Sequence, residues 1–397
     1  MNIPSLQSTL QTKKIATIIL IIMLTQFVYL EGYGVSIIKV GLMALMPLIF
    51  FFKVPFISKG FFWGLIYILS ISIIAFFHSY IRFSTIGFLA LYVFTSVVFY
   101  NLIYSNAFTL EYFIKLLKYI IFAYTICLIC QQIFVLIGIK FMPLINLNNQ
   151  LYLSIDKLPS LSIEPSHTAR ILTAVMFGYL KCTEFKQGTS VKIQQLFSTE
   201  HKWVTIGFFW TMLTMGSGTA FVGIGILSLY FINRQTVFYI IPLFIAFFAV
   251  SSQLEIKQFD RATNLGGAVL TGDIQSMKEA DGSGASRIIP LINTFANMDL
   301  TKEETWIGVG TTTIEHNTTG WKRDDVKIGA IEQYGILTYF ISLLFIFNCF
   351  IRKILSIETL IFILLLGCSL VNVYYVWGIL MLFGTIKYFD NYDVRYE

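Results

Sequence analysis

The chain has 397 residues, of which 56% are hydrophobic, 16% aromatic and 13% charged, with a formal net charge of +6. A soluble domain carries roughly 25% charged residues, so this composition excludes an ordinary water-exposed surface and, with its repeated apolar runs, indicates a polytopic helical membrane protein. The alternating segments of about ten residues that mark a membrane barrel are absent. The basic residues lie scattered between apolar runs, which argues against a nucleic-acid partner.

Twelve apolar segments are predicted to span the membrane, which gives an all-α transmembrane bundle. They cover residues 14–31, 35–52, 60–78, 86–104, 113–139, 162–180, 203–215, 217–232, 236–252, 329–350, 357–370 and 373–388. Two segments, 203–232 and 357–388, are each consistent with one span or two, and Gly216-Ser217-Gly218 favours a hairpin in the first. With both termini in the cytoplasm, fifteen Lys and Arg fall inside and only Arg82, Lys140 and Lys157 in short outer loops.

The predicted organisation has three parts: residues 1–252 with nine spans, a large periplasmic loop at 253–328, and 329–397 with three spans and a cytoplasmic tail. The loop holds 19 charged residues, including 11 of the chain's 22 acidic ones. Within it, Asp273–Ala280 and Lys302–Trp306 are candidates for short helices, and Gly282-Ser-Gly284 is a flexible break. No internal repeat is visible, which weighs against a transporter built on inverted repeats.

The first candidate site lies at Leu161-Ser-Ile-Glu-Pro-Ser-His-Thr-Ala-Arg170. Ser162 is a plausible N-cap and Pro165 suits the first turn of a helix that begins at the outer interface. The N-terminal end of such a helix suits an anionic phosphate, and His167 and Arg170, at i and i+3, add charge on one face. The alternative is that Glu164 completes a cap and Arg170 only extends toward the interface.

Two further candidates lie in the large loop. Arg287 follows small residues in Ser283-Gly-Ala-Ser-Arg-Ile-Ile-Pro290, which would let a phosphate approach closely. His316 ends the run from Trp306 through Gly308-Val-Gly310, and an extracytoplasmic imidazole serves well as a general base near neutral pH. The isolated GxG has no strand–helix context, so it does not indicate a nucleotide site. The alternatives are that Arg287 is a solvated surface residue and that His316 has a structural role.

The sequence predicts no metal and no cofactor. It has no HExxH motif, no cysteine cluster and no paired carboxylates at metal-ligand spacing. Cys127 and Cys130 have the spacing of a redox motif but lie inside an apolar run, so we expect them to be packing residues.

These stretches, in this order, resemble the O-antigen polymerase and O-antigen ligase superfamily of integral membrane glycosyltransferases. The resemblance spans about residues 160–345. Glu164-Pro165-Ser166 is similar to the family's element at the start of a central helix, and Thr214-Met-Gly-Ser217 to its turn between two short helices. The elements that resemble its large loop are Ser286-Arg287, Gly308-Val-Gly310 and His316-Asn317.

The resemblance implies metal-independent transfer of an oligosaccharide from undecaprenyl pyrophosphate to an acceptor sugar, on the periplasmic side of the bacterial inner membrane. It assigns Arg287 and Arg170 to the pyrophosphate and His316 to the base or to a phosphate contact, with Glu164 as the alternative base. His167 is a further candidate for phosphate. The implied partners are the lipid-linked oligosaccharide, the bilayer, and flippase and chain-length regulator proteins.

One position departs from the family pattern. Many members carry an arginine after the serine of the short-helix turn, where this chain has Gly218. Arg170, Arg261 or Arg323 would have to supply the missing cation. The leading function is polymerisation of lipid-linked repeat units, and the alternatives are ligation of glycan to lipid A core and a flippase or transporter for lipid-linked glycans.

Overall fold

The described part of the protein is all-helical. The computed structural model describes residues 6–26, 36–53, 57–78, 81, 83–139, 157–232, 264, 267–268, 271–280, 285, 289, 298–308, 310, 330–370 and 373–391. Within these ranges no β-strand forms. The all-α prediction is therefore confirmed for this part of the chain.

The longer helices follow the predicted apolar segments closely. Their bounds are α1 (Leu6–Leu24), α2 (Ile37–Lys53), α3 (Lys59–Ala75), α4 (Phe83–Tyr104), α5 (Leu110–Leu136), α6 (Pro165–Gln187), α7 (Lys202–Thr214), α8 (Gly218–Ser228), α14 (Ala330–Cys349) and α16 (Tyr374–Asn391). The shorter ones are α11 (Ile274–Ala280), α13 (Glu303–Ile307), α15 (Ile357–Leu360), the 3-10 helices η1 (Ile193–Phe197) and η2 (Leu229–Phe231), and the π-helix η4 (Ile361–Leu365). The short helices α11 and α13 confirm the two that were predicted in the loop.

The helix bounds can be compared with the predicted segments at three places in the chain. Segment 203–232 divides into α7 and α8, as the glycine-rich turn indicated. Helix α1 begins at Leu6, before the predicted first span, and takes Lys13 into the helix, where its ammonium lies 3.7 Å from the centre of the Tyr112 ring. The predicted span 357–370 is too long, since helical structure there ends at Leu365, short of the roughly 20 residues that cross a bilayer. The segment 236–252 lies outside the described residues.

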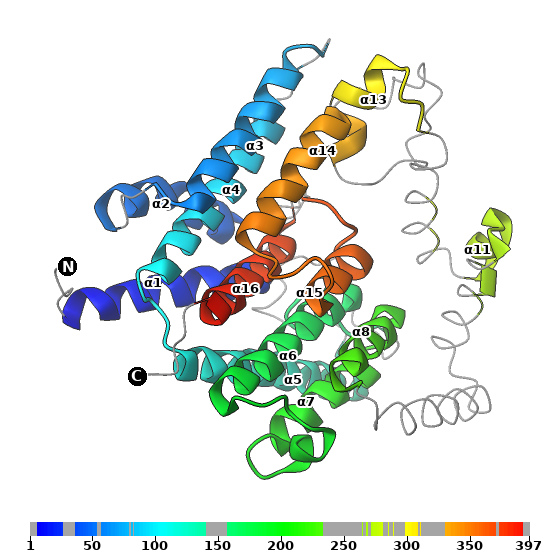
Figure 1. Cartoon of the computed structure of the whole chain (residues 1–397). Coiled ribbons are helices and arrows are strands. Elements are labelled where there is room, and N and C mark those ends of the chain that lie inside the picture. Colours follow the sequence, from blue (N-terminus) through cyan, green and yellow to red (C-terminus); the bar gives the residue numbers. More distant parts are fainter. Residues whose placement is uncertain are drawn as a thin grey trace.

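Helix α6 occupies the centre of the bundle. It packs against α5, α7, α8 and α16 (Figure 1) and is buried along most of its length. Gly178 permits the close approach of α16, because a Cβ there would lie 3.1 Å from a methyl of Leu382. The hydroxyls of Thr173 and Thr183 donate to the carbonyls four residues earlier, so these buried polar groups are paired within the helix.

Helices α3, α4 and α14 form a second group. α3 packs against both α4 and α14, and Figure 1 shows α3 and α14 running side by side. Among the helices of the described residues, α4 and α5 are long and apolar enough to cross a membrane, although buried helices of soluble proteins meet the same criteria. The twelve-span layout and its orientation stay predictions.

Several helices carry an exposed apolar stripe. On α3 the stripe consists of Phe62, Leu65, Leu69 and Ile73, each 44–58% exposed. On α7 it consists of Trp203, Ile206, Trp210 and Leu213, each 41–66% exposed. Spacings of three and four residues place each set on one helix face. Large exposed apolar patches are rare on soluble monomers and mark surfaces that contact lipid or another protein.

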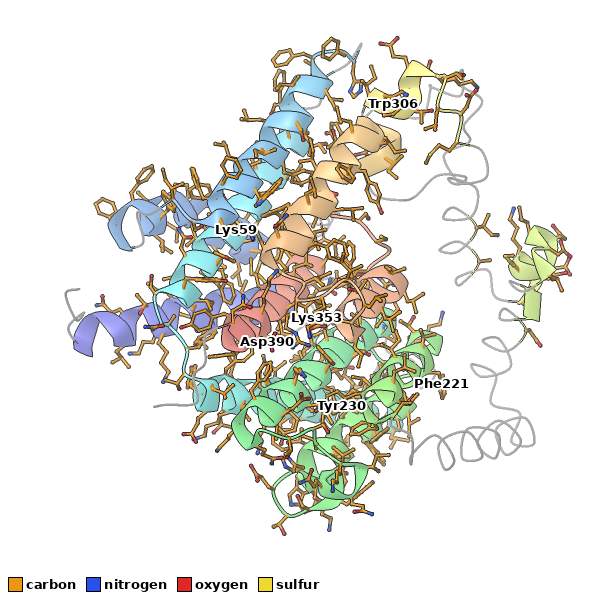
Figure 2. The ribbon with its side chains drawn as sticks, viewed as in Figure 1. Lys59, Phe221, Tyr230, Trp306, Lys353 and Asp390 are labelled. Atoms are coloured by element: carbon orange, nitrogen blue, oxygen red, sulfur yellow. The ribbon has the colours of Figure 1, made fainter. Side chains whose placement is uncertain are left out.

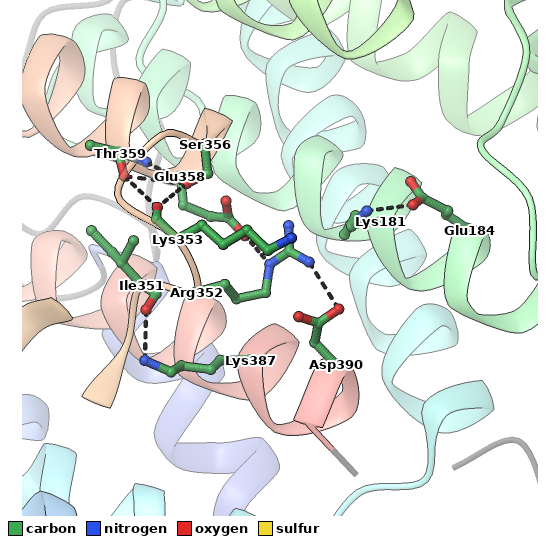
Figure 3. Close-up of polar contacts among 10 residues, drawn as sticks. All are labelled: Lys181, Glu184, Ile351, Arg352, Lys353, Ser356, Glu358, Thr359, Lys387 and Asp390. Atoms are coloured by element: carbon green, nitrogen blue, oxygen red, sulfur yellow. Dashed lines mark hydrogen bonds and ion pairs between the residues drawn. The ribbon is translucent and has the colours of Figure 1, made fainter. Parts of the chain in front are cut away.

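A network of charged groups ties three helices together at one end of the bundle (Figure 3). The Arg352 guanidinium contacts a carboxylate oxygen of the fully buried Glu358 at 2.5 Å and one of Asp390 at 3.1 Å. The Lys387 ammonium donates to the carbonyls of Phe347, Asn348 and Ile351 at 2.7–3.0 Å. These bonds join the end of α14, the start of α15 and the end of α16, and they satisfy the last carbonyls of α14.

Two glycines allow α13 to pack against the N-terminal part of α14, which is kinked at Gly335. Gly308 (φ 76°, ψ 178°) and Gly335 (φ 74°, ψ 174°) adopt a backbone region that is essentially restricted to glycine. A Cβ at Gly335 would lie 2.0 Å from the carbonyl oxygen of Trp306. The amide of Gly310 donates to the carbonyl of Gln333 at 3.0 Å. The glycines at 308 and 310 therefore have a packing role.

We expect Gly335→Ala to lower the free energy of unfolding by about 1–3 kcal/mol through backbone strain, with a further loss from overlap with the Trp306 carbonyl. Thermal unfolding of the purified protein measures the change. Gly225→Ala in α8 is the matched control, because nothing lies within 4 Å of its added Cβ. Equal unfolding temperatures for Gly335→Ala and the unchanged protein would contradict this account.

Candidate functional site

The start of α6 forms the centre of the candidate site. The helix begins at Pro165, with Glu164 in an extended conformation at the N-cap position and no hydrogen bond from its side chain to the backbone. The prediction that Ser162 is the N-cap is therefore wrong. The reason is local: a residue that precedes proline is pushed out of the helical region, which puts the helix boundary at Glu164.

The helix start offers fewer free backbone donors than predicted. The Glu164 carbonyl already accepts the amides of His167 and Thr168 at 3.0 and 3.3 Å, and Pro165 has no amide hydrogen. The Glu164 carboxylate accepts a hydrogen bond from the Ser166 hydroxyl at 3.2 Å, and its side chain is 57% exposed. Binding of an anion here therefore depends mainly on side chains.

His167 and Arg170 meet on one tyrosine of α16. The His167 ring centre lies 4.5 Å from that of Tyr375, and the guanidinium of Arg170 donates to the Tyr375 hydroxyl while lying 5.7 Å from the ring centre. The Nε of Arg170 is buried without a hydrogen-bond partner among the described residues. The prediction that His167 and Arg170 share one face of the helix is confirmed.

Lys39 joins this group from α2. Its side chain is 1% exposed, donates to the carbonyl of Thr25 and lies 4.3 Å from the centre of the Tyr374 ring. Within the described part of the chain, neither Lys39 nor Arg170 lies within salt-bridge distance of a carboxylate. Together, Lys39, His167 and Arg170 surround the first turn of α16. We call these three residues with Tyr374 and Tyr375 the basic cluster.

Gln26, just after α1, holds the start of α6 in place. Its amide donates to the carbonyl of Leu161 at 2.9 Å, and its side-chain oxygen lies 2.8 Å from the amide nitrogen of Ile163 and 3.1 Å from Nδ1 of His167. Because Gln26 is 4% exposed, water cannot easily replace these bonds. The position of His167 therefore depends on the end of α1.

The segment before α6 is tied to neighbouring helices by the same kind of bond. Gln131 of α5 accepts the amide of Ser160 at 2.8 Å and donates to its carbonyl at 2.9 Å. The amide of Leu158 donates to the carbonyl of Met215 in the turn between α7 and α8. This turn is the predicted Thr214–Ser217 element, so it is linked through the backbone to the segment that precedes the first candidate site.

The remaining predicted site residues lie outside the described residues. They are Arg261, Arg287, His316 and Arg323. Around Arg287, Ala285 and Ile289 are buried together with Ala268 and with Met277 of α11. The described part of Trp306–Asn317 reaches His78, whose Nε2 lies 2.8 Å from the carbonyl oxygen of Ile307.

Neither cysteines nor metal ligands gather in the described residues. All five cysteines are free, with Cys127 buried in α5. Across the same ranges, no group of three His, Cys, Asp or Glu side chains is arranged to hold a metal ion.

Comparison with known proteins gives no match to any family model, curated protein or solved structure. The family resemblance therefore depends on the quoted sequence elements alone. The geometry adds four residues that sequence reasoning did not assign to the site, namely Gln26, Lys39, Tyr374 and Tyr375. The available signal was the polar character of Gln26 and Lys39 within apolar segments, since polar groups at membrane depth are functional candidates.

We expect Gln26→Ala to destabilise the protein by about 1–3 kcal/mol, because the substitution leaves the partly buried amide of Ile163 without its acceptor. Thermal unfolding of the purified variant measures this loss. Gln275→Ala in α11 is the control, since Gln275 is exposed and its side-chain NH2 donates only to Glu279; it should change stability by less than about 0.5 kcal/mol. A similar effect of both substitutions would show that Gln26 does not hold the start of α6.

Proposed function

We propose that this protein is a membrane-embedded, metal-independent glycosyltransferase that polymerises repeat units of a surface polysaccharide. It would transfer an oligosaccharide from undecaprenyl pyrophosphate to the acceptor sugar of another lipid-linked unit on the periplasmic side. The basic cluster is the observation that carries the proposal. It gathers positive charge at one end of the bundle without a carboxylate partner for Lys39 or Arg170 among the described residues.

Two observations support the membrane setting. The apolar stripes on α3 and α7 are suited to lipid contact. Hydrogen bonds also join helix ends that the twelve-span layout places on one side: the end of α1 with the start of α6, and the start of α6 with the start of α16. In the proposed layout these ends are periplasmic, and loop 253–328 faces them.

The proposed reaction is displacement at the anomeric carbon of the donor sugar. An acceptor hydroxyl attacks this carbon, the bond from the carbon to the pyrophosphate oxygen breaks, and undecaprenyl pyrophosphate leaves with the bonding electrons. Cations that meet the leaving group stabilise its growing charge in the transition state. In this scheme Arg170, His167 and Arg287 contact the pyrophosphate, and Arg261 or Arg323 supplies a further cation.

The proton of the acceptor hydroxyl passes to a base, which is His316 or Glu164. Glu164 fits this role because its carboxylate is largely exposed at the start of α6 and close to the basic cluster. His316 fits because an imidazole is basic near neutral pH. The scheme needs no metal, because arginine, lysine and histidine side chains provide the positive charge.

A flippase is the alternative from another functional class. Transporters place ionisable residues near the bilayer midplane, where their substrates bind. Here Lys39 is the third residue of α2 and Arg170 the sixth of α6, so both lie near helix starts. This placement favours a site that opens at the membrane surface, as expected of the transferase.

Arg170→Ala should reduce polymer formation about 10- to 100-fold, because a charge-assisted contact to the leaving group contributes roughly 1.5–3 kcal/mol. Tyr375→Phe should cause a smaller loss, since it removes only the hydroxyl that positions Arg170. Incorporation of labelled sugar from lipid-linked repeat units into polymer by the purified, reconstituted protein measures both. Lys186→Ala is the control at the opposite end of α6, where Lys186 pairs with Glu111. Normal turnover in Arg170→Ala would contradict a role of the basic cluster in the reaction.

Arg287→Ala and His316→Ala should abolish polymer formation while the protein still accumulates in the membrane, because each removes a proposed catalytic contact. Glycan length and yield from cells that express each variant give the readout. Polymer of normal length and yield from both variants would contradict the assignment of these two residues.

Deletion of the gene followed by glycan analysis separates the functions. If the protein is a polymerase, the deletion strain should carry single repeat units attached to lipid A core. Polymer that accumulates on undecaprenyl pyrophosphate would identify a ligase instead, and lipid-linked units trapped in the cytoplasm would identify a flippase.

A further inference from the structure

A second polar site lies at the opposite end of the bundle. A cavity of about 350 Å3 opens where α3 begins and where α4, α14 and α16 end. Its lining includes Ser58, Lys59, Tyr100, Tyr104, Asn348 and Lys387. None of the lining residues is acidic, so two lysines line the cavity without a carboxylate in its wall.

The two lysines contribute differently. Lys387 donates to three carbonyl oxygens at the end of α14. All three of its N–H donors are therefore occupied, and it can contribute to anion binding only through its positive charge. Lys59 is exposed, and no carboxylate lies within salt-bridge distance of it among the described residues. Lys59 therefore has free donors for an anion, and Lys387 adds a fixed positive charge behind it.

The start of α3 adds to the positive potential. Lys59 is the first residue of this 17-residue helix, so the positive end of the helix dipole lies at the cavity. The Ser58 hydroxyl accepts the amide of Phe61 at 3.1 Å and fixes the first turn. The rings of Tyr100 and Tyr104 stack at 4.3 Å and form an aromatic wall. Cations beside tyrosine rings at a bundle end match the chemistry of a membrane interface.

Exposed apolar side chains near the start of α3 indicate whether a lipid headgroup or a soluble phosphate fits the cavity. Ile57 lines the cavity and is 81% exposed. Phe52, at the end of α2, is 79% exposed, and stacking of Phe50 on Phe61 at 5.6 Å holds the end of α2 against α3. A soluble phosphate would make no use of these apolar surfaces, whereas acyl chains would cover them.

We propose that this cavity binds the phosphate headgroup of an anionic membrane lipid. Lys59 donates to the phosphate, Lys387 supplies a second positive charge, and the acyl chains lie along Ile57 and Phe52. In the membrane orientation proposed above, the cavity faces the cytoplasmic leaflet, where basic pockets between helices bind lipid headgroups. The site lies at the other end of the bundle from the basic cluster and does not depend on the transferase activity.

Native mass spectrometry of the purified full-length protein tests the proposal, with phosphatidylglycerol as the probe and phosphatidylcholine and inorganic phosphate as comparisons. Lys59→Ala should weaken phosphatidylglycerol binding roughly fivefold, the effect expected of one lysine near an anionic lipid. Lys59→Arg should keep it. Lys353→Ala is the matched control, because Lys353 is exposed on a neighbouring loop and does not line the cavity (Figure 2).

Loss of phosphatidylglycerol binding in Lys59→Ala but not in Lys353→Ala supports the proposal. An equal loss in both variants would overturn it, since general attraction to a basic surface would then explain the binding. Inorganic phosphate that binds as tightly and displaces the lipid would also overturn it, because the ligand would then be a soluble phosphate. Since the Lys59 side chain makes no ion pair with any described residue, its substitution leaves the fold intact, and the unfolding temperature of Lys59→Ala verifies this.

Discussion

The arrangement of this protein depends on one constraint: polar groups that are buried in an apolar helical bundle must find their partners within the protein. Helix α6 illustrates it, because its threonine hydroxyls bond to carbonyls one turn earlier. Where α6 begins, the partners come from other helices, with Gln26 from the end of α1 and Tyr375 from the start of α16. Satisfying these groups therefore brings basic side chains from separate helices into one cluster.

The helical fold was largely predictable because apolar runs in the sequence mark helices directly. The shared face of His167 and Arg170 was predictable for the same reason, since a spacing of three residues is a local property of a helix. The N-cap at Glu164 was also available from the sequence, through the restriction that Pro165 imposes on the residue before it. The inclusion of Lys13 in α1 was missed because a lysine pair usually marks a membrane boundary.

The partners of the basic cluster were not predictable, since they depend on which helices become neighbours. Arg170 and Tyr375 are 205 residues apart in the chain, and Gln26 and His167 are 141 apart. No local spacing connects such pairs. The family resemblance pointed to Glu164 and Arg170 but gave no reason to include Lys39 or Tyr375. Those residues enter the site through packing of α2 and α16 against their neighbours.

Basic side chains at the two ends of the bundle have different kinds of partner. At one end Arg352 has two carboxylate partners, so its charge is compensated within the protein. At the other end, Lys39 and Arg170 contact a carbonyl, a hydroxyl and aromatic rings, and no carboxylate of the described residues lies within salt-bridge distance of either. Lys387, at the same end as Arg352, also bonds only to carbonyl oxygens, so lysines with neutral partners occur at both ends of the bundle. What distinguishes the basic cluster is that side chains of three helices, α2, α6 and α16, meet there, and that the Nε of Arg170 is buried without a partner among the described residues.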